Sequence, residues 1–257
     1  MTFSQTTLYK SREWPNFVLG NHDNGRLASR VGEKFAKTLG AMLLTLPGTQ
    51  TLYYGDEIGM VNVEGTSVDE GGLNRDEARS PMQWDNSTTG GFSNSSEPWN
   101  GNYGDTEMIN VEDQQNDPNS MLNMYKNLIK MRLENQQIRR GWYCYREAVA
   151  GSVVSYTREQ ADLKTGFLVM INVKEEELDL SGVVADFADK WDIDMGCDNL
   201  RYWDSDSVCG VLSGQGFMIF EYDISKKGAE RYQNQKDDSE CYVSREVRVA
   251  SGIDYKI

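Results

Sequence analysis

FVLGNHDNGRL, residues 17–27, is the stretch that decides how the fold is interpreted, and it holds the only histidine of the chain. Its apolar beginning belongs to a run from Asn16 to Leu19 that proline and glycine bound, which predicts a short buried strand. His22 and Asp23 follow where this strand ends. In a parallel barrel the carboxyl end of a strand opens onto the active-site face, so both side chains would meet a ligand there. The alternative is a turn in which Asp23 makes an Asx-type bond and His22 packs without a function.

A helix and a second strand are predicted directly after this stretch. Apolar residues recur every four positions on one helix face, and the helix must end by Pro47-Gly48. These residues are Leu27, Val31, Phe35, Leu39 and Leu43. The β-rich run Thr51–Tyr54 closes at Gly55 and predicts a second short strand. Strand, helix and strand within about 40 residues indicate a parallel βα unit.

Two adjacent carboxylates, Asp56 and Glu57, follow the second predicted strand. A pair of carboxylates can serve as acid and base in glycoside hydrolysis. Adjacent residues of an extended chain point to opposite sides, however, so these two cannot easily face one substrate. We therefore expect them to cap the following segment or to form an ion pair with Arg79.

The long segment from Gly59 to Asp117 is rich in Gly, Asn, Ser and Asp, and its length predicts a structured functional loop. Arg79 in this loop can form a bidentate contact with a carboxylate. Trp84, Phe92 and Trp99 offer flat apolar faces on which sugar rings stack. The alternative is that these aromatic residues only anchor the loop.

The second half of the chain has a different pattern. Asp117-Pro118 is expected to cap a helix that buries Leu122, Tyr125, Ile129 and Leu133. After Gly141 come short segments rich in β-branched or aromatic residues, which predict an all-β antiparallel sandwich domain. The segments are 152–158, 166–173, 200–204 and 216–224. We place a domain boundary near residue 138, between domains of residues 1–137 and 138–257.

Composition excludes several classes of partner. Against 40 Asp and Glu stand 26 Lys and Arg, and the net charge of -14 repels phosphate backbones, so we expect no nucleic-acid partner. No run reaches the roughly 18 apolar residues of a membrane span, and the first residues lack a signal-peptide pattern. Any membrane attachment is therefore expected through a segment upstream of this chain.

Two sequons and four cysteines favour an extracellular or luminal protein. Asn86 and Asn94 each begin an N-glycosylation pattern. The cysteines have no metal-binding spacing, so we expect disulfides and neither a metal nor a cofactor. They can pair in three ways. We favour Cys197 with Cys209, which flank a short polar segment, and Cys144 with Cys241, whereas buried free thiols are the alternative.

Three motifs together resemble one family. FVLGNHDN followed by a helix, LPGTQTLYYGDEIGM and ARSPMQWD occur in this order. They resemble the last part of the catalytic domain of the alpha-amylase superfamily, glycoside hydrolase family 13, in its alpha-glucosidase and oligo-1,6-glucosidase branch. The resemblance is specific from Trp14 to about Asn135. It implies that Phe17–Leu19 and Thr51–Tyr54 are the last two strands of a (β/α)8 TIM barrel, which is an α/β fold followed by the antiparallel β-sandwich domain.

The resemblance also implies roles for three residues. His22 would contact the sugar in the cleavage subsite, Asp23 would be the transition-state-stabilising carboxylate, and Arg79 would support the neighbouring subsite. The substrate would be an alpha-linked glucose oligosaccharide. A retaining glycosidase also needs a nucleophile and a general acid about 5 Å apart. In this family both lie on earlier strands, and neither motif occurs before Trp14. We therefore interpret the chain as a C-terminal portion that should not hydrolyse a glycoside by itself.

A second resemblance competes with the first. Residues 140–159 and 241–246 are similar to the C-terminal β domain of the rBAT-type heavy subunits of amino acid transporters. In those subunits cysteines at the places of Cys144 and Cys241 are linked, which supports this pairing. The parent is then either an alpha-glucosidase or an ancillary subunit with a transporter light chain as partner. Because His22, Asp23 and Arg79 are intact, we favour the enzyme from the sequence.

Overall fold

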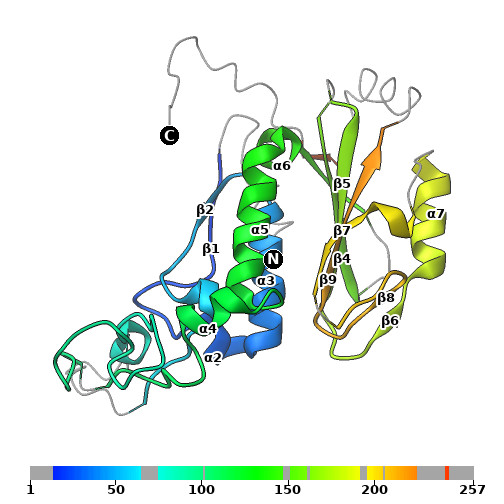
Figure 1. Ribbon diagram of the computed structural model, residues 1–257. Helices are drawn as coiled ribbons and strands as arrows, with labels where there is room; N and C mark the ends of the chain where they lie inside the picture. Colours follow the sequence, from blue (N-terminus) through cyan, green and yellow to red (C-terminus); the bar gives the residue numbers. More distant parts are fainter. Residues whose placement is uncertain are drawn as a thin grey trace, which may run out of the picture.

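The computed structural model describes residues 14–64, 75–100, 102–146, 151–160, 163–191, 196–204, 206–224 and 241–242. Figure 1 shows a group of helices and long loops on one side and an antiparallel sheet on the other. Residues 243–246, which contribute to the second resemblance, lie outside the described residues.

The predicted βα unit is present, with the two strands side by side. Strand β1 (Asn16–Val18) pairs in parallel with β2 (Thr49–Thr51), so that Asn16 lies opposite Thr49. The prediction that the second strand covers Thr51–Tyr54 is wrong. Pairing begins as soon as the chain leaves Gly48, where the amide of Thr49 donates to the carbonyl of Pro15. In the described part of the chain, β1 and β2 pair only with each other, and no barrel closes.

The single predicted helix is divided in two. Helix α2 (Leu27–Val31) and helix α3 (Glu33–Thr45) meet at Gly32, whose φ of 81° interrupts the helical backbone. The buried stripe of α3 also differs from the prediction, because Phe35 and Leu39 are only half-buried. Small residues replace them in the core, and they allow close approach of a neighbouring helix. The buried stripe consists of Ala36, Thr38, Gly40, Ala41, Leu43 and Leu44.

Helix α5 (Met121–Glu134) packs against α3, with α4 (Val111–Asn116) and α6 (Gln136–Arg140) before and after it. Its N-cap is Ser120, whose Oγ accepts from the amide of Asn123, and not the predicted Asp117-Pro118. Leu122 and Tyr125 are buried as predicted, but Leu133 is exposed. Methionines fill the stripe instead. Met121, Met124 and Met131 are all buried.

The second half of the chain forms a six-stranded antiparallel sheet with strand order β10-β3-β4-β5-β9-β7. The four predicted strand segments are confirmed to within two residues at either end. The strands are β3 (Trp142–Tyr145), β4 (Val153–Glu159), β5 (Thr165–Asn172), β7 (Leu200–Trp203), β9 (Phe217–Asp223) and β10 (Cys241–Tyr242).

Both faces of this sheet are covered, but not by a second sheet of similar size. Alternate residues of β5 serve the two faces: Val169 joins the core with α3, α5 and α6, whereas Leu168 joins a second core. The second core lies under α7 (Ser181–Trp191) and a small sheet of β6 (Leu178–Asp179) and β8 (Val211–Leu212). The sandwich prediction is therefore met only in part, because a helix that was not predicted supplies much of the second layer. The fold is mixed α/β with an antiparallel sheet.

Two arginines, the half-buried Arg132 and the buried Arg158, hold the end of α3 and the turn into β2. Arg132 donates from Nη1 to the carbonyls of Leu44 (3.0 Å) and Leu46 (2.8 Å) and from Nη2 to that of Gly48 (2.7 Å). Arg158 donates from Nη1 to the carbonyl of Thr45 (2.5 Å). Burial lowers the pKa of Arg158 to about 9. These arginines satisfy helix-terminal carbonyls and so fix where β2 begins.

The favoured disulfide between Cys197 and Cys209 is present, with the two Cα atoms 5.5 Å apart. Cys144 on β3 lies opposite Cys241 on β10 in the strand register. The side chain of Cys241 lies outside the described part of the chain, so this second pairing stays a prediction.

Candidate functional site

His22 and Asp23 lie in the turn between β1 and α2, and both side chains face solvent. Their side chains are 68% and 52% exposed, and His22 Nε2 is 3.4 Å from Asp23 Oδ2. The Asx-type bond of this turn is made by Asn21, whose Oδ1 accepts from the amide of Asp23 at 2.9 Å. The carboxylate of Asp23 is therefore not used to form the turn.

Two arginines of the 3-10 helix η2 (Arg75–Arg79) reach this carboxylate from the long loop. Arg75 Nη1 lies 3.3 Å and Arg79 Nη2 lies 3.4 Å from Asp23 Oδ1. Arg79 Nε also donates to the carbonyl of His22 at 2.8 Å. The structure thus brings together the three residues that the sequence singles out, and it adds Arg75. Because Asp23 is exposed and the two arginines are only half-buried, each ion pair by itself contributes little stability.

The buried Arg26 links the turn that carries His22 and Asp23 to the segment after β2. Arg26 packs its guanidinium carbon 4.9 Å from the ring centroid of Tyr53 and 4.4 Å from that of Tyr54. Its Nη1 donates to the carbonyl of Tyr54, and its amide donates to Asn62 Oδ1 at 2.7 Å. The loop after β1 is thereby tied to the segment after β2. Sequence reasoning missed Arg26, because nothing in the local pattern shows that two tyrosines 27 and 28 positions away would flank it.

Asp56 takes neither of the two predicted roles, because the N-cap of the following 3-10 helix is Gly55, with no side-chain cap bond, and Arg79 pairs with other carboxylates. It lies at the start of the 3-10 helix η1 (Asp56–Ile58), is buried, and packs against Gly20. A Cβ on Gly20 would lie 2.6 Å from Asp56 Oδ2, so a larger residue there would force the carboxylate to shift. Burial raises the pKa of Asp56 to about 6, and the charge of Arg26 partly opposes this shift. The predicted ion pair with Arg79 is not formed, because Arg79 turns to Asp23 and to Asp76 Oδ1 at 3.3 Å.

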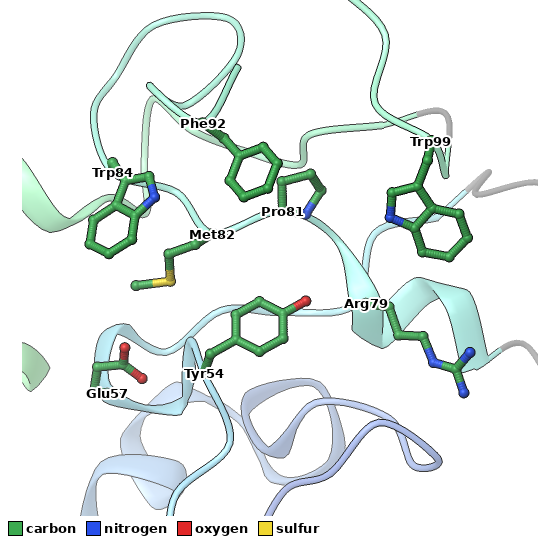
Figure 2. A pocket seen from close by; sticks show the side chains of 8 residues that line it. All are labelled: Tyr54, Glu57, Arg79, Pro81, Met82, Trp84, Phe92 and Trp99. Atoms are coloured by element: carbon green, nitrogen blue, oxygen red, sulfur yellow. The ribbon is translucent and has the colours of Figure 1, made fainter.

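A pocket of about 400 Å³ lies beside this arginine. Figure 2 shows that aromatic rings surround it, with Glu57 and Arg79 at opposite ends. Trp84, Phe92 and Trp99 are 51%, 53% and 66% exposed, so they do not act as buried anchors of the loop. Flat exposed rings with a few polar groups suit the binding of carbohydrate or another amphipathic ligand. The lining residues are Tyr54, Glu57, Arg79, Pro81, Met82, Trp84, Phe92 and Trp99.

The described part of the chain contains neither a metal-binding cluster nor a membrane-spanning helix. Among those residues, no group of three or more His, Cys, Asp and Glu could hold a metal ion. No helix found there has the length and apolar character needed to cross a membrane.

The arrangement can hold a polyhydroxylated ligand. The imidazole of His22, the carboxylate of Asp23 and the guanidinium of Arg79 meet beyond the carboxyl ends of β1 and β2. Together they supply hydrogen-bond donors and acceptors. A carboxylate accepts hydrogen bonds from the hydroxyl groups of such a ligand and stabilises nearby positive charge.

Comparisons with known proteins agree with this geometry. The family model described as "Alpha amylase, catalytic domain" matches residues 1–141. The human protein "Amino acid transporter heavy chain SLC3A1" is 32% identical over 243 residues, which is 93% of this chain and 35% of that protein. The alpha-glucosidase of Apis mellifera is 41% identical over 134 residues, which is 46% of this chain and 23% of that protein.

Solved structures show the same fold. The trehalulose synthase MutB from Pseudomonas mesoacidophila superposes with a TM-score of 0.66 and 27% identity, over 81% of this chain and 43% of that one. The present chain spans about a third of the length of the SLC3A1 heavy chains that it resembles.

Proposed function

The chain belongs to the alpha-amylase family, and on this premise we propose that it is part of the ectodomain of an amino acid transporter heavy chain of the SLC3A1 type. Such a subunit acts together with a transporter light chain. It needs the fold of a glycoside hydrolase but not its catalysis.

The coverage of the matches carries this proposal. Similarity to the human heavy chain extends over 93% of the chain, so it must include most of the antiparallel sheet, whereas the bee alpha-glucosidase matches only 46%. From the sequence we favoured the enzyme on the strength of His22, Asp23 and Arg79. The coverage favours the heavy chain instead, because the glucosidases match 46% to 69% of the chain and the human heavy chain matches 93%.

The same proposal includes the cellular compartment of the protein and the boundary between its two domains. A disulfide between Cys197 and Cys209 suits an oxidising compartment, as an ectodomain requires. We keep residues 1–137 as the end of the barrel domain and residues 138–257 as the β domain. The two would form a rigid body, because one hydrophobic core contains Leu44 of α3 and Val169 of β5.

A second candidate function is that of an alpha-glucosidase, and one observation favours it. His22, Asp23 and Arg79 meet at the ends of two parallel strands, where a substrate clamp is expected. In this case Asp23 stabilises the transition state, His22 and Arg79 bind the sugar, and the nucleophile and acid come from other parts of the full-length protein.

One substitution separates the two functions. The full-length protein is expressed with and without a light chain, and amino acid uptake and maltose hydrolysis are measured for wild type and Asp23→Asn. For a heavy chain we expect uptake that depends on co-expression and is unchanged in Asp23→Asn. For a glucosidase we expect hydrolysis that falls at least about 100-fold in the variant. Uptake that is equal with and without this protein would reject the heavy-chain proposal.

A further inference from the structure

Each of the two sequons begins two residues after an aromatic residue that lines the pocket, and this spacing suggests what occupies the pocket. Trp84 precedes Asn86 by two residues, and Phe92 precedes Asn94 by two residues. Both aromatic side chains line the pocket, and both are about half exposed. Two residues of chain span at most about 7 Å, so a sugar on either asparagine begins within reach of its ring.

We propose that Asn86 and Asn94 carry N-linked glycans whose first sugar residues stack on Trp84 and Phe92, so that the pocket is closed by the chain's own carbohydrate. The proposal rests on the proposed function only in requiring that the chain enters a compartment where N-glycosylation takes place.

The acceptor asparagines are available for modification. Asn86 and Asn94 are both exposed, and neither side-chain amide makes a hydrogen bond in the described part of the chain. They lie on turns at the surface rather than in strands or helices. A bulky polar modification is therefore tolerated at either position without disturbing the core.

Hydrogen bonds hold the backbone near Trp84 and Phe92 in place, although both aromatic side chains are exposed. The amide of Trp84 donates to the carbonyl of Gly90 at 2.7 Å, and the carbonyl of Trp84 accepts from the amide of Glu112 at 3.0 Å. The segment after Asn94 is fixed by Tyr103, whose buried hydroxyl donates to the carbonyl of Ser95 at 2.7 Å. A ring on a fixed backbone can hold a sugar at a small cost in conformational entropy.

The chemistry of the pocket suits a saccharide more than an apolar peptide. The C–H face of a pyranose ring stacks on aromatic rings, and its hydroxyl and acetamido groups need polar partners. Glu57 and Arg79 lie at opposite ends of the pocket and supply an acceptor and a donor (Figure 2). An apolar occupant would displace water from the Glu57 carboxylate without offering it a hydrogen bond.

Glycopeptide mass spectrometry of the full-length protein from eukaryotic cells gives the first test. We expect sugar on Asn86 and Asn94. A protein that reaches the cell surface with both asparagines unmodified would overturn the proposal and leave the proposed function intact. A protein that supports no uptake but carries both glycans would reject the heavy-chain function and leave this proposal standing.

Stacking is tested by the effect of enzymatic deglycosylation on thermal unfolding. Removing the glycans should lower the Tm by about 2–4 °C when Trp84 and Phe92 are present, and by less than about 1 °C in the Trp84→Leu, Phe92→Leu double variant. Trp99→Leu is the matched control, since Trp99 lines the same pocket but stands at neither sequon, and its deglycosylation shift should equal that of wild type. Equal shifts in all three proteins would refute the stacking.

Discussion

Replacement of Asp56 by asparagine should stabilise the protein at neutral pH and remove a dependence of stability on pH. Asp56 is buried against Gly20, and burial raises its pKa from 3.8 to about 6. A carboxyl group whose pKa is raised on folding binds its proton more tightly in the native state. Its contribution to stability is therefore fully present below about pH 4, is lost as the pH rises to about 6, and does not change further above that.

The magnitude follows from the size of this shift. About two pKa units correspond to about 3 kcal/mol of lost stability at pH 7. Asp56→Asn keeps the shape of the side chain and cannot ionise, so the free energy of unfolding at pH 7 should rise by up to about 3 kcal/mol. The variant and wild type should converge near pH 4.

Urea unfolding between pH 4 and pH 8 measures this difference. Glu57→Gln is the matched control, because Glu57 is the adjacent carboxylate but is only half-buried, and its unfolding curves should stay close to those of wild type at every pH. A loss of stability in Asp56→Asn at pH 7 would show that the ionised carboxylate is stabilised by Arg26 more than it is destabilised by burial. The reasoning from burial would then be refuted.

Two further substitutions test the packing and the disulfide. Gly40→Ala places a Cβ 2.7 Å from ring carbon Cζ of Tyr125. The overpacking costs about 1–3 kcal/mol and should exceed the gain in helix propensity of about 1 kcal/mol, so the free energy of unfolding should fall. Gly182→Ala on α7 has no described atom within 4 Å of its Cβ, and it should raise the free energy of unfolding in the same denaturation assay. Replacing Cys197 and Cys209 by serine should lower the free energy of unfolding by about 3 kcal/mol, and a reductant that leaves the wild type unchanged would contradict this.

The βα unit could be predicted because its signals are local. An apolar run, a helical stripe and a second β-rich run follow one another, and β1 and β2 are indeed parallel neighbours. The errors arose where tertiary contacts decide. Gly32 divides the helix, and the turn at Gly48 starts β2 two residues earlier than the β-rich run indicated. Neither effect is visible in the periodicity of apolar residues.

The β half shows the same limit. Four of the six strands of the main sheet, β4, β5, β7 and β9, could be predicted from β-branched and aromatic runs, but the layer that covers the sheet could not. Strand β5 is apolar on both faces, so its sequence shows that both are covered and does not show by what. The apolar spacing of Val183, Val184 and Ala188, which pack on the second core, is the signal that would have indicated α7.

The candidate site was predicted residue by residue, but its connections were not. Arg79 and Asp23 are 56 residues apart, and only the family resemblance suggested a common site. The contact of Arg75 with Asp23 depends on how the long loop folds back. The contact of Arg26 with Tyr53 and Tyr54 depends on how the segment after β2 lies against the turn after β1. Single-sequence patterns carry no information about such distant pairs.

The same geometry explains why an intact His22, Asp23 and Arg79 does not by itself indicate hydrolysis. Arg79 donates to the backbone carbonyl of His22 and contacts the carboxylate of Asp23, so these residues also join the loop after β1 to η2. A heavy chain without catalysis would still use them, because Arg79 joins the loop that carries the aromatic pocket to the turn after β1. Catalysis must therefore be tested by a change that removes transition-state stabilisation and leaves the loop anchored. Asp23→Asn is such a change, because it would abolish transition-state stabilisation while the bond from Arg79 to the carbonyl of His22 remains.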